Sequence, residues 1–212
     1  AVGIIAAARG LGSQIGDTVV VGSYFDDDAG RNSGSAYVFY KTRTGWQLYI
    51  KLTAMDASPD DLFGFSCAIS PSGNLIAIGS YRDDDLFTNT GSVYAFRRNG
   101  AVWTQEPKIK PSDPAANDNF GYSVAVSGPS GNETIVAGAV RDDDNGTDSG
   151  SAYVFEQISG NWVQKAKLKP ADGFSLDNFG ISVGVDAPAG MPSTAIIGSW
   201  QSDTPAGTDT GA

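Results

Sequence analysis

The sequence predicts an all-β protein built from small four-stranded antiparallel sheets, and three observations lead to this fold class. Glycine is abundant, with 27 of 212 residues, close to twice its usual share of about 7%, which suits many tight turns. Short apolar segments alternate with Gly, Asn and Pro turns, and no segment has a helical period. The same succession of segments also recurs along the chain, which is typical of a repeat architecture.

Three sequence markers define the repeat. The pattern G-S-x-Y-x-F begins at residues 34, 91 and 150, the dipeptide F-G at 63, 120 and 179, and a Trp stands at 46, 103 and 162. Each marker therefore returns after 57 to 59 residues. The predicted units are residues 2–62, 63–119, 120–178 and an incomplete 179–212.

The unit that starts at Phe63 displays the elements most clearly. In chain order they are a strand at 63–70 (FGFSCAIS), a tight turn at 71–74 (PSGN), a strand at 75–80 (LIAIGS), a loop at 81–90, and strands at 91–98 and 102–110 separated by NGA. Four such strands without an intervening helix are typical of a propeller blade. The sequence therefore predicts a β-propeller with about three and a half blades, as one partial domain over residues 1–212.

Aromatic side chains gather in the third and fourth strands of each unit. In GSAYVFY both faces of the strand are apolar or aromatic, as expected for a sheet that packs between two neighbouring blades. The residues expected to pack between blades are Tyr37, Phe39, Tyr94, Phe96, Tyr153 and Phe155, with Trp46, Trp103 and Trp162.

The markers also carry a family resemblance. Phe63-Gly64 is followed by Gly79-Ser80 and then GSVYAF, Phe120-Gly121 by Gly138-Ala139 and then GSAYVF, and Phe179-Gly180 by Gly198-Ser199. This order resembles the FG-GAP repeat of integrin α-subunit propellers and of many bacterial surface proteins. The resemblance implies adhesion and a seven-bladed ring, so we expect the remainder of a longer polypeptide to complete the ring.

One part of the integrin pattern is absent. Integrin-type repeats that bind calcium carry D-x-D-x-D-G between the F-G strand and the next strand, whereas this chain has SPSGN, SGPSGNE and DAPAGMPS there. Any calcium site would therefore lie elsewhere in the unit.

The carboxylates occupy two segments of each unit. One is the loop between the second and third strands, with aspartates at 26–28, 83–85 and 142–144, and the other is the linker to the next F-G. Successive antiparallel strands place both segments on the same rim, so we expect one strongly acidic rim. The net charge of −10 disfavours nucleic-acid and anionic-membrane partners.

The aspartate loops allow two interpretations. Their oxygen-bearing residues alternate in a way that resembles calcium ligands, and the candidates are Asp26, Asp28, Asn32, Asp83, Asp85, Asn89, Asp142, Asp144 and Asp148. Calcium (Ca2+) is then the expected cofactor. In the other interpretation, the aspartates cap backbone N–H groups in turns and pair with Arg31, Arg82 or Arg141. Asp61, Asp118 and Asp177, two residues before F-G, are expected to be turn caps.

The sequence offers little for catalysis. It contains no histidine, and Cys67 lies in an apolar strand pattern, so we predict no catalytic residue and no enzyme activity. No segment approaches the roughly 18 apolar residues of a membrane helix, so none is predicted. Asn132 and Asn145 begin N-x-S/T sequons and are candidate glycosylation sites.

We therefore expect a non-catalytic extracellular or cell-surface module for interaction or adhesion, whose acidic rim binds a protein or glycan partner. One alternative is a carbohydrate-binding propeller in which Trp200 stacks on a sugar. This tryptophan stands where the other units have Tyr24, Tyr81 and Val140. The other alternative is a structural segment of a surface assembly or filament.

Overall fold

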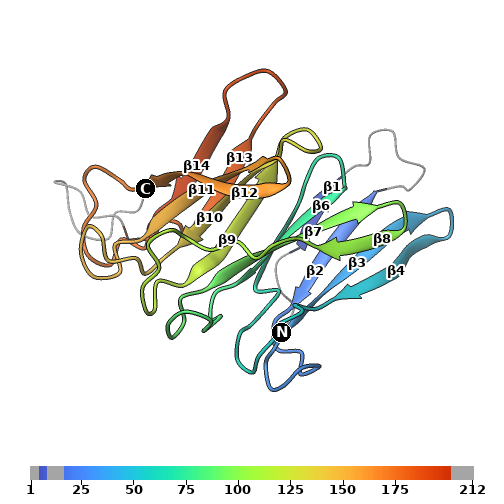
Figure 1. Cartoon of the computed structure of the whole chain (residues 1–212), viewed down its shortest axis with the longest axis horizontal. Coiled ribbons are helices and arrows are strands. Elements are labelled where there is room, and N and C mark those ends of the chain that lie inside the picture. The colour runs from blue at the N-terminus through green and yellow to red at the C-terminus, as the bar shows by residue number, and fades with distance from the viewer. Residues whose placement is uncertain (1–4, 9–16, 202–212) are drawn as a thin grey trace.

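The computed structural model describes residues 5–8 and 17–201, and every regular element in them is a β-strand (Figure 1). Blade 1 consists of β1 (Ile5–Ala8), β2 (Thr18–Ser23), β3 (Ser35–Thr42) and β4 (Gly45–Leu52). Blade 2 consists of β5 (Ser66–Ile69), β6 (Leu75–Ser80), β7 (Ser92–Asn99) and β8 (Val102–Gln105). Blade 3 consists of β9 (Phe120–Ser127), β10 (Thr134–Ala139), β11 (Ser151–Ile158) and β12 (Asn161–Leu168), and blade 4 of β13 (Ser182–Asp186) and β14 (Thr194–Gly198). Within these residues no helix has the length and apolar character needed to cross a membrane.

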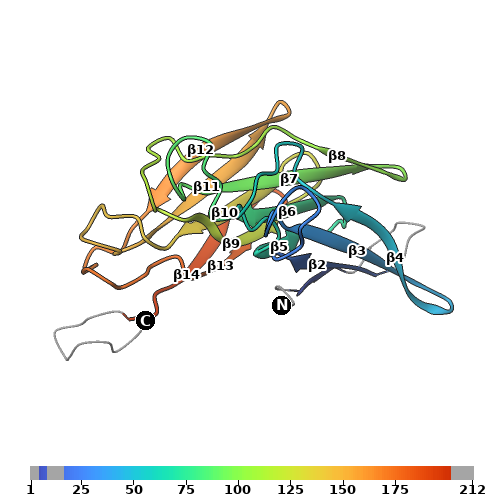
Figure 2. The ribbon, with the colours of Figure 1, turned by 90° about the horizontal axis from the view of Figure 1, so that it is seen from below.

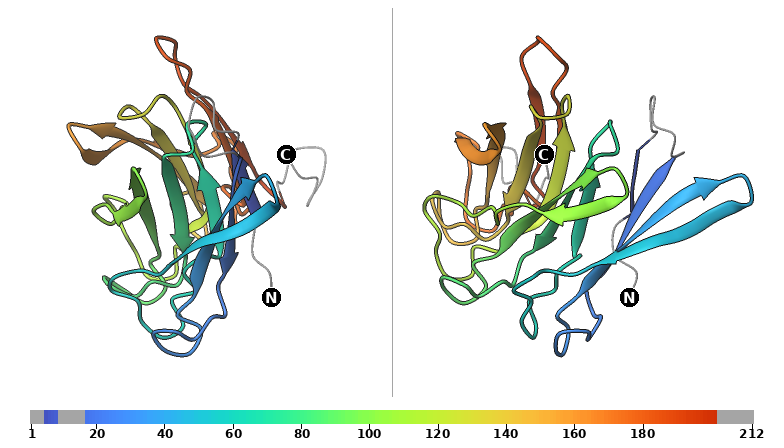
Figure 3. Two further views of the ribbon diagram at one scale, coloured as in Figure 1. Left: turned by 90° about the vertical axis from the view of Figure 1, so that its right-hand side faces the viewer. Right: turned by 45° about the vertical axis from the view of Figure 1, so that its right-hand side comes forward.

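Each sheet is an antiparallel meander in chain order. The three larger sheets have four strands each, and β13 pairs with β14 in a two-stranded sheet. The sheets stand side by side with β5 against β9 and β9 against β13 (Figure 3). This arrangement confirms the predicted partial β-propeller, with three four-stranded blades and half of a fourth among the described residues. The unit boundaries and the single domain stay predictions.

The core lies between the blades because successive residues of a strand point to opposite faces. In β6, Ile76 and Ile78 pack toward blade 1, whereas Leu75 and Ala77 pack toward blade 3. The third strand β7 alternates in the same way. Both faces of blade 2 are therefore buried, as the two-sided apolar pattern predicts.

The predicted aromatic packing is confirmed where a blade has a neighbour on the relevant side. Tyr94, Phe96 and Trp103 are buried between blades 1 and 2, and Tyr153 and Phe155 are buried between blades 2 and 3. Trp162 is half-buried against the second of these cores. In blade 1, Tyr37 and Phe39 are half-buried and Trp46 is exposed.

The F-G dipeptide forms the joint between consecutive blades. Phe63 is fully buried and pairs with Gly34 through an isolated bridge, while the N–H of Gly64 donates to the carbonyl of Gly79. A Cβ on Gly22 would lie 1.8 Å from the carbonyl oxygen of Gly64, so only glycine allows the two blades to approach this closely. Phe120-Gly121 and Phe179-Gly180 form the same joint one and two blades further on.

Two predicted strands of blade 2 are shorter than expected. The predicted strand 63–70 is found only from Ser66 to Ile69, whereas the equivalent strand of blade 3 begins at its F-G phenylalanine, Phe120. The predicted strand 102–110 ends at Gln105, and the chain pairs with β7 again only at Ile109, opposite Val93. A short irregularity thus interrupts the outer edge of this blade.

Candidate functional site at the aspartate-rich rim

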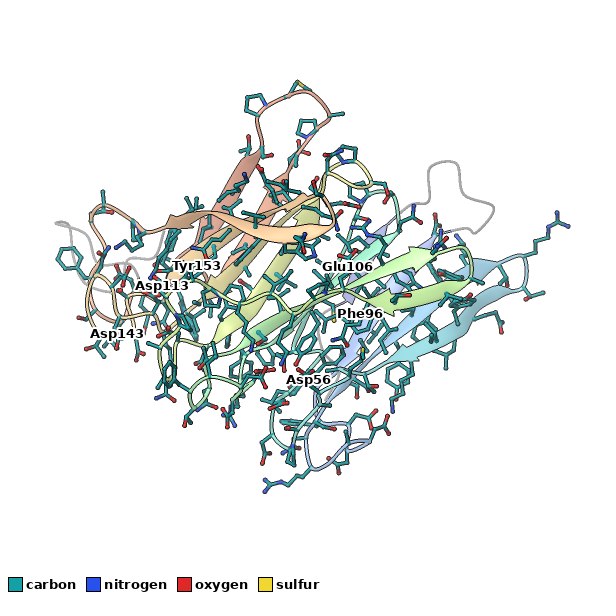
Figure 4. All side chains as sticks on the ribbon, viewed as in Figure 1. Asp56, Phe96, Glu106, Asp113, Asp143 and Tyr153 are labelled. Carbon is teal, nitrogen blue, oxygen red and sulfur yellow. The ribbon has the colours of Figure 1, made fainter. Side chains whose placement is uncertain are left out.

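The predicted acidic rim consists of the loops after β2, β6 and β10 and of the linkers between blades. These segments run along the lower edge of Figure 1, so Figure 2, which views the molecule from below, faces them. Asp56 and Asp113 from two linkers and Asp143 from a blade 3 loop lie along this edge (Figure 4). The antiparallel topology therefore brings the two acidic segments of each unit together.

The first aspartate of each triplet is held by a tyrosine of its own blade. In blade 2, Asp83 is buried and accepts a hydrogen bond from the Tyr94 hydroxyl at 2.7 Å. In blade 3, Asp142 accepts one from Tyr153 at 2.9 Å. In blade 1, Asp26 accepts hydrogen bonds from Tyr37 at 2.8 Å. The tyrosine of G-S-x-Y-x-F thus anchors the loop that precedes it.

A lysine ammonium lies between the first and third aspartates of every triplet. Lys108 Nζ is 2.7 Å from Asp83, 2.5 Å from Asp85 and 2.5 Å from Asp56 of the preceding linker. We refer to each such group of one lysine, its tyrosine and the surrounding aspartates as a lysine cluster. The other two centre on Lys51, with Asp26 and Asp28, and on Lys167, with Asp113, Asp142 and Asp144.

The tyrosine ring completes the lysine cluster from one side. The ammonium lies 4.8 Å from the ring centroid of Tyr94 for Lys108, and 5.2 Å from that of Tyr153 for Lys167. The ring faces attract the cation. The repeated tyrosine therefore contacts both the aspartate and the lysine.

The pKa values in the lysine clusters follow from these contacts. Hydrogen bonds from Lys51 and Ser35 hold the pKa of Asp26 far below its usual value. Burial alone would lower the pKa of Lys108, but the carboxylates of Asp56 and Asp83 raise it above its ordinary value. The clusters are therefore ion pairs at neutral pH.

The middle aspartate of each triplet has a different task. Asp27 Oδ1 accepts the backbone N–H of Asn32 at 2.6 Å, and Asp143 Oδ1 accepts that of Asp148 at 2.7 Å. Asn32 and Asp148 both have a φ of 53°, in the left-handed region that Asn and Asp tolerate. The same bond joins Asp84 to Asn89 in blade 2. These contacts are the turn caps of the second interpretation.

The geometry therefore divides the predicted calcium ligands. It brings together Asp26 with Asp28, Asp83 with Asp85, and Asp142 with Asp144. In each pair, however, the group between the two carboxylates is a lysine ammonium. It assigns Asn32, Asn89 and Asp148 to the turn, where the Asn32 amide donates to Asp60 and the Asn89 amide to Asn117. Among the described residues no group of three or more His, Cys, Asp or Glu side chains has the arrangement of a metal site. Calcium binding stays a prediction.

The arginine partners of the second interpretation are not the ones found. The aspartates pair with lysines that lie in the fourth strand of blades 1 and 3 and just after it in blade 2, a signal that sequence reasoning missed. Lys51, Lys108 and Lys167 recur with the same spacing as the aspartates, so the lysine clusters were detectable from the repeat.

The aspartates before F-G are buried turn caps. Asp61 Oδ2 accepts the N–H of Ser58 at 2.8 Å, and Asp118 Oδ2 accepts that of Ala115 at 2.7 Å. Asp177 accepts the N–H of Phe174 in the same way. Burial raises the pKa of Asp61 to about 7 and that of Asp118 to about 6.

The other predicted site residues lie apart from the lysine clusters. Trp200 follows β14 and is 68% exposed. Asn132 is exposed in the turn between β9 and β10, and Asn145 is exposed in the loop after β10, where its amide donates to the carbonyl of Pro170. Sugar stacking on Trp200 and glycosylation of the two asparagines stay predictions.

Comparisons with known proteins agree with this architecture. The crystal structure of Saccharomyces cerevisiae Sqt1, a WD40-like propeller, is similar to the chain with a TM-score of 0.52 at 12% sequence identity. The similarity covers 94% of the chain and 43% of Sqt1, so the chain spans less than half the length of that protein, and the likeness concerns the fold alone. A comparison with curated proteins finds no significant match.

The family model described as FG-GAP repeat matches residues 13–39, 46–96, 103–155 and 162–212. These matches cover most of the chain, and they include the F-G and G-S positions whose glycines form the joints between blades. The protein therefore belongs to the FG-GAP repeat family.

Proposed function

We propose that the chain is a non-catalytic interaction module of an extracellular or cell-surface protein, and that its aspartate-rich rim binds a protein partner in adhesion. FG-GAP repeats in a propeller-like fold suggest a protein-interaction module. To this we add the rim as the partner surface and adhesion as the role. The family supports the extracellular setting, because FG-GAP repeats are typical of extracellular proteins.

One observation carries the proposal: the rim exposes large apolar side chains beside its carboxylates. They come from the loops and linkers of different blades and are Phe25, Leu86, Phe87, Phe174 and Leu176, each about half exposed. Aromatic residues are enriched in the centres of protein interfaces, and grouped exposed apolar residues mark interaction sites. The lysine clusters hold the loops that carry Phe25, Leu86 and Phe87, so these exposed residues are presented on a fixed framework.

The chemistry of the chain supports a binding role over a catalytic one. The sequence has no histidine, and the only cysteine, Cys67, is buried, with a pKa that burial raises to about 12. The thiol therefore stays protonated and shielded from substrates.

The proposal is tested with the fluorescently labelled chain and intact cells of its source. We expect saturable binding that the double variant Leu86→Ser/Phe87→Ser weakens at least tenfold, because it removes two apolar contacts from one loop. Val102→Ser is the matched control, since Val102 is 62% exposed in the β7–β8 hairpin on the opposite rim. Circular dichroism confirms that all variants are folded. Unchanged binding by the double variant, or equal loss with the control, would contradict the proposal.

Carbohydrate binding is a second candidate, favoured by the exposed indole of Trp200. Trp side chains commonly stack on the apolar faces of sugars, and this ring stands at the rim end of blade 4. A glycan array probed with the chain and with Trp200→Ala tests it, and a signal that survives the substitution would remove Trp200 from the site.

A further inference from the structure

The joint between blades 2 and 3 contains a pocket whose chemistry departs from the rest of the rim. The pocket has a volume of about 230 Å³ and lies between the loop after β6 and the loop after β10. Its lining consists of Tyr81, Arg82, Asn89, Asn117, Asn119, Tyr122 and Arg141. No acidic residue lines it, although the chain has a net charge of −10.

The equivalent joint between blades 1 and 2 shows what is special about this pocket. The repeat aligns Arg82 with Phe25, Asn117 with Asp60 and Asn119 with Leu62, so two apolar residues and a carboxylate stand where blades 2 and 3 have a guanidinium and two amides. The joint between blades 3 and 4 repeats Asn119 as Asn178, but the three described joints differ at the two arginine positions, which hold Phe25 with Arg82, Arg82 with Arg141, and Arg141 with Gln201. Two arginines therefore stand together at this joint and at neither of the other two, which indicates a ligand for the pair.

Both arginines are available for a ligand. Arg82 and Arg141 are exposed at the pocket, and in the described part of the chain no carboxylate is ion-paired with either guanidinium. The nearest acidic loops are already engaged, because Asp83 and Asp85 pair with Lys108 while Asp142 and Asp144 pair with Lys167. The lysine clusters thus leave two unpaired guanidinium groups beside one small cavity.

Ring contacts and amide hydrogen bonds hold the walls of the pocket in place, and none of these contacts pairs an arginine with a carboxylate. The guanidinium of Arg82 lies 5.6 Å from the centre of the Tyr81 ring, and the rings of Tyr81 and Tyr122 are 5.3 Å apart. The buried Asn119 amide donates to the carbonyls of Tyr81 and Asn89 at 3.3 Å. Tyr122 and Arg141 line the same pocket, and the positive charge of Arg141 opposes the rise that burial and Tyr81 cause in the pKa of Tyr122.

We propose that this pocket binds an acidic sugar unit, with its carboxylate between Arg82 and Arg141 and its hydroxyls on the asparagine amides and tyrosine hydroxyls. Two guanidinium groups suit one carboxylate, and the mixed donors and acceptors of the amides suit a ring that carries several hydroxyls. The volume fits a single ring. The surrounding acidic rim opposes long polyanions, which favours one carboxylate over an acidic peptide or a nucleic acid.

Leu86 and Phe87 belong to the same loop as Arg82 and Asn89 but do not line the pocket. Each proposal is therefore tested with its own ligand and its own substitutions, so that the failure of one is distinguished from the failure of the other. Binding of D-glucuronate, D-glucose and acetate to the full chain is measured by isothermal titration calorimetry and by NMR line broadening of the ligand. We expect glucuronate to bind, and glucose and acetate to bind at least tenfold more weakly. Glucose binding as tightly as glucuronate would overturn the role of the carboxylate, and acetate doing so would overturn the sugar.

Variants then locate the site. We expect Arg82→Gln/Arg141→Gln to weaken glucuronate binding at least tenfold, whereas Arg31→Gln/Arg43→Gln, which removes the same charge from two other exposed arginines, leaves it unchanged. Asn117→Asp introduces the carboxylate that Asp60 supplies at the neighbouring joint, so it should fold normally and repel glucuronate. Equal loss in both arginine pairs, undiminished binding by Asn117→Asp, or no glucuronate binding by the wild type would overturn the proposal.

Discussion

At the scale of single residues, the lysine clusters explain how three consecutive aspartates are tolerated at the mouth of a buried strand. The first and third carboxylates neutralise one lysine, and the middle carboxylate accepts a backbone N–H. Asp83 is only 2% exposed, so its charge needs a partner. The ammonium therefore takes the central position that a bound cation would otherwise occupy.

Removing one lysine tests this role. We expect Lys108→Met to lower the free energy of unfolding by about 2–4 kcal/mol, because it leaves the buried Asp83 carboxylate beside Asp56 and Asp85 without a countercharge. Lys165→Met is the matched control, since the Lys165 pair with Glu156 is exposed at 3.7 Å and should contribute less than about 0.5 kcal/mol. Urea denaturation measures both variants, and equal effects would refute the lysine cluster as a stabilising unit.

The same clusters bear on the calcium prediction. With lysine as the resident cation, EDTA should leave the melting midpoint of the wild type unchanged, whereas Lys108→Met should gain stability when calcium is added, because three carboxylates then lack their ammonium. Differential scanning fluorimetry measures both. A fall in the wild-type midpoint on chelation would instead support structural calcium.

At the scale of elements, the glycines of F-G and G-S set the distance between blades. A Cβ on Gly79 in β6 would lie 1.9 Å from the carbonyl oxygen of Gly121, which belongs to the backbone of the next blade and cannot move alone. The close approach of the two backbones therefore requires glycine at this position of the motif. The phenylalanine beside it fills the space between the same two blades.

We therefore expect Gly79→Ala to lower the free energy of unfolding by about 3 kcal/mol or more, since the added methyl group forces the blades apart. Gly184→Ala in β13 is the control, because a Cβ there would meet nothing within 4 Å, and its effect should stay within about 1 kcal/mol. Thermal and chemical denaturation measure the difference. Comparable stabilities for the two variants would show that the joint is more yielding than the structure indicates.

The elements themselves were largely predictable from the sequence. The strands 75–80 and 91–98 follow from their apolar pattern, and they correspond to β6 and β7. The start of β5 and the end of β8 were not predictable from polarity, because the apolar pattern continues through Phe63 before β5 and through Ile109 after β8. In the site, turn caps followed from local spacing, whereas the lysine partners lie more than twenty residues away, so that only the matching repeat spacing of the lysines and aspartates indicated them.

At the scale of the whole molecule, the repeat predicts the blade stack because each unit must bury two faces against its neighbours. The tryptophans show this dependence directly. Trp103 of blade 2 is 8% exposed and its indole N–H donates to Tyr40 of blade 1, whereas Trp46, at the same place in blade 1, is 46% exposed. The same residue type is therefore core or surface according to whether a preceding blade lies against it.

We expect Trp103→Ala to lower the free energy of unfolding by about 3–5 kcal/mol, because it empties a filled space between two blades. Trp46→Ala should cost less than about 1 kcal/mol in the same chain. Guanidinium denaturation followed by circular dichroism compares them. A large effect of Trp46→Ala would indicate that its ring has a partner in solution.

The lysine clusters also give the stack a direction. Lys108 forms an ion pair with Asp56, which lies in the linker that precedes the blade of Lys108, and Lys167 pairs with Asp113 of the next linker in the same way. Each of these two junctions thus combines an acid from one unit with a base from the following one. Duplication or loss of a complete unit would recreate the same junction, so the number of blades could change during evolution without any new contact having to be invented.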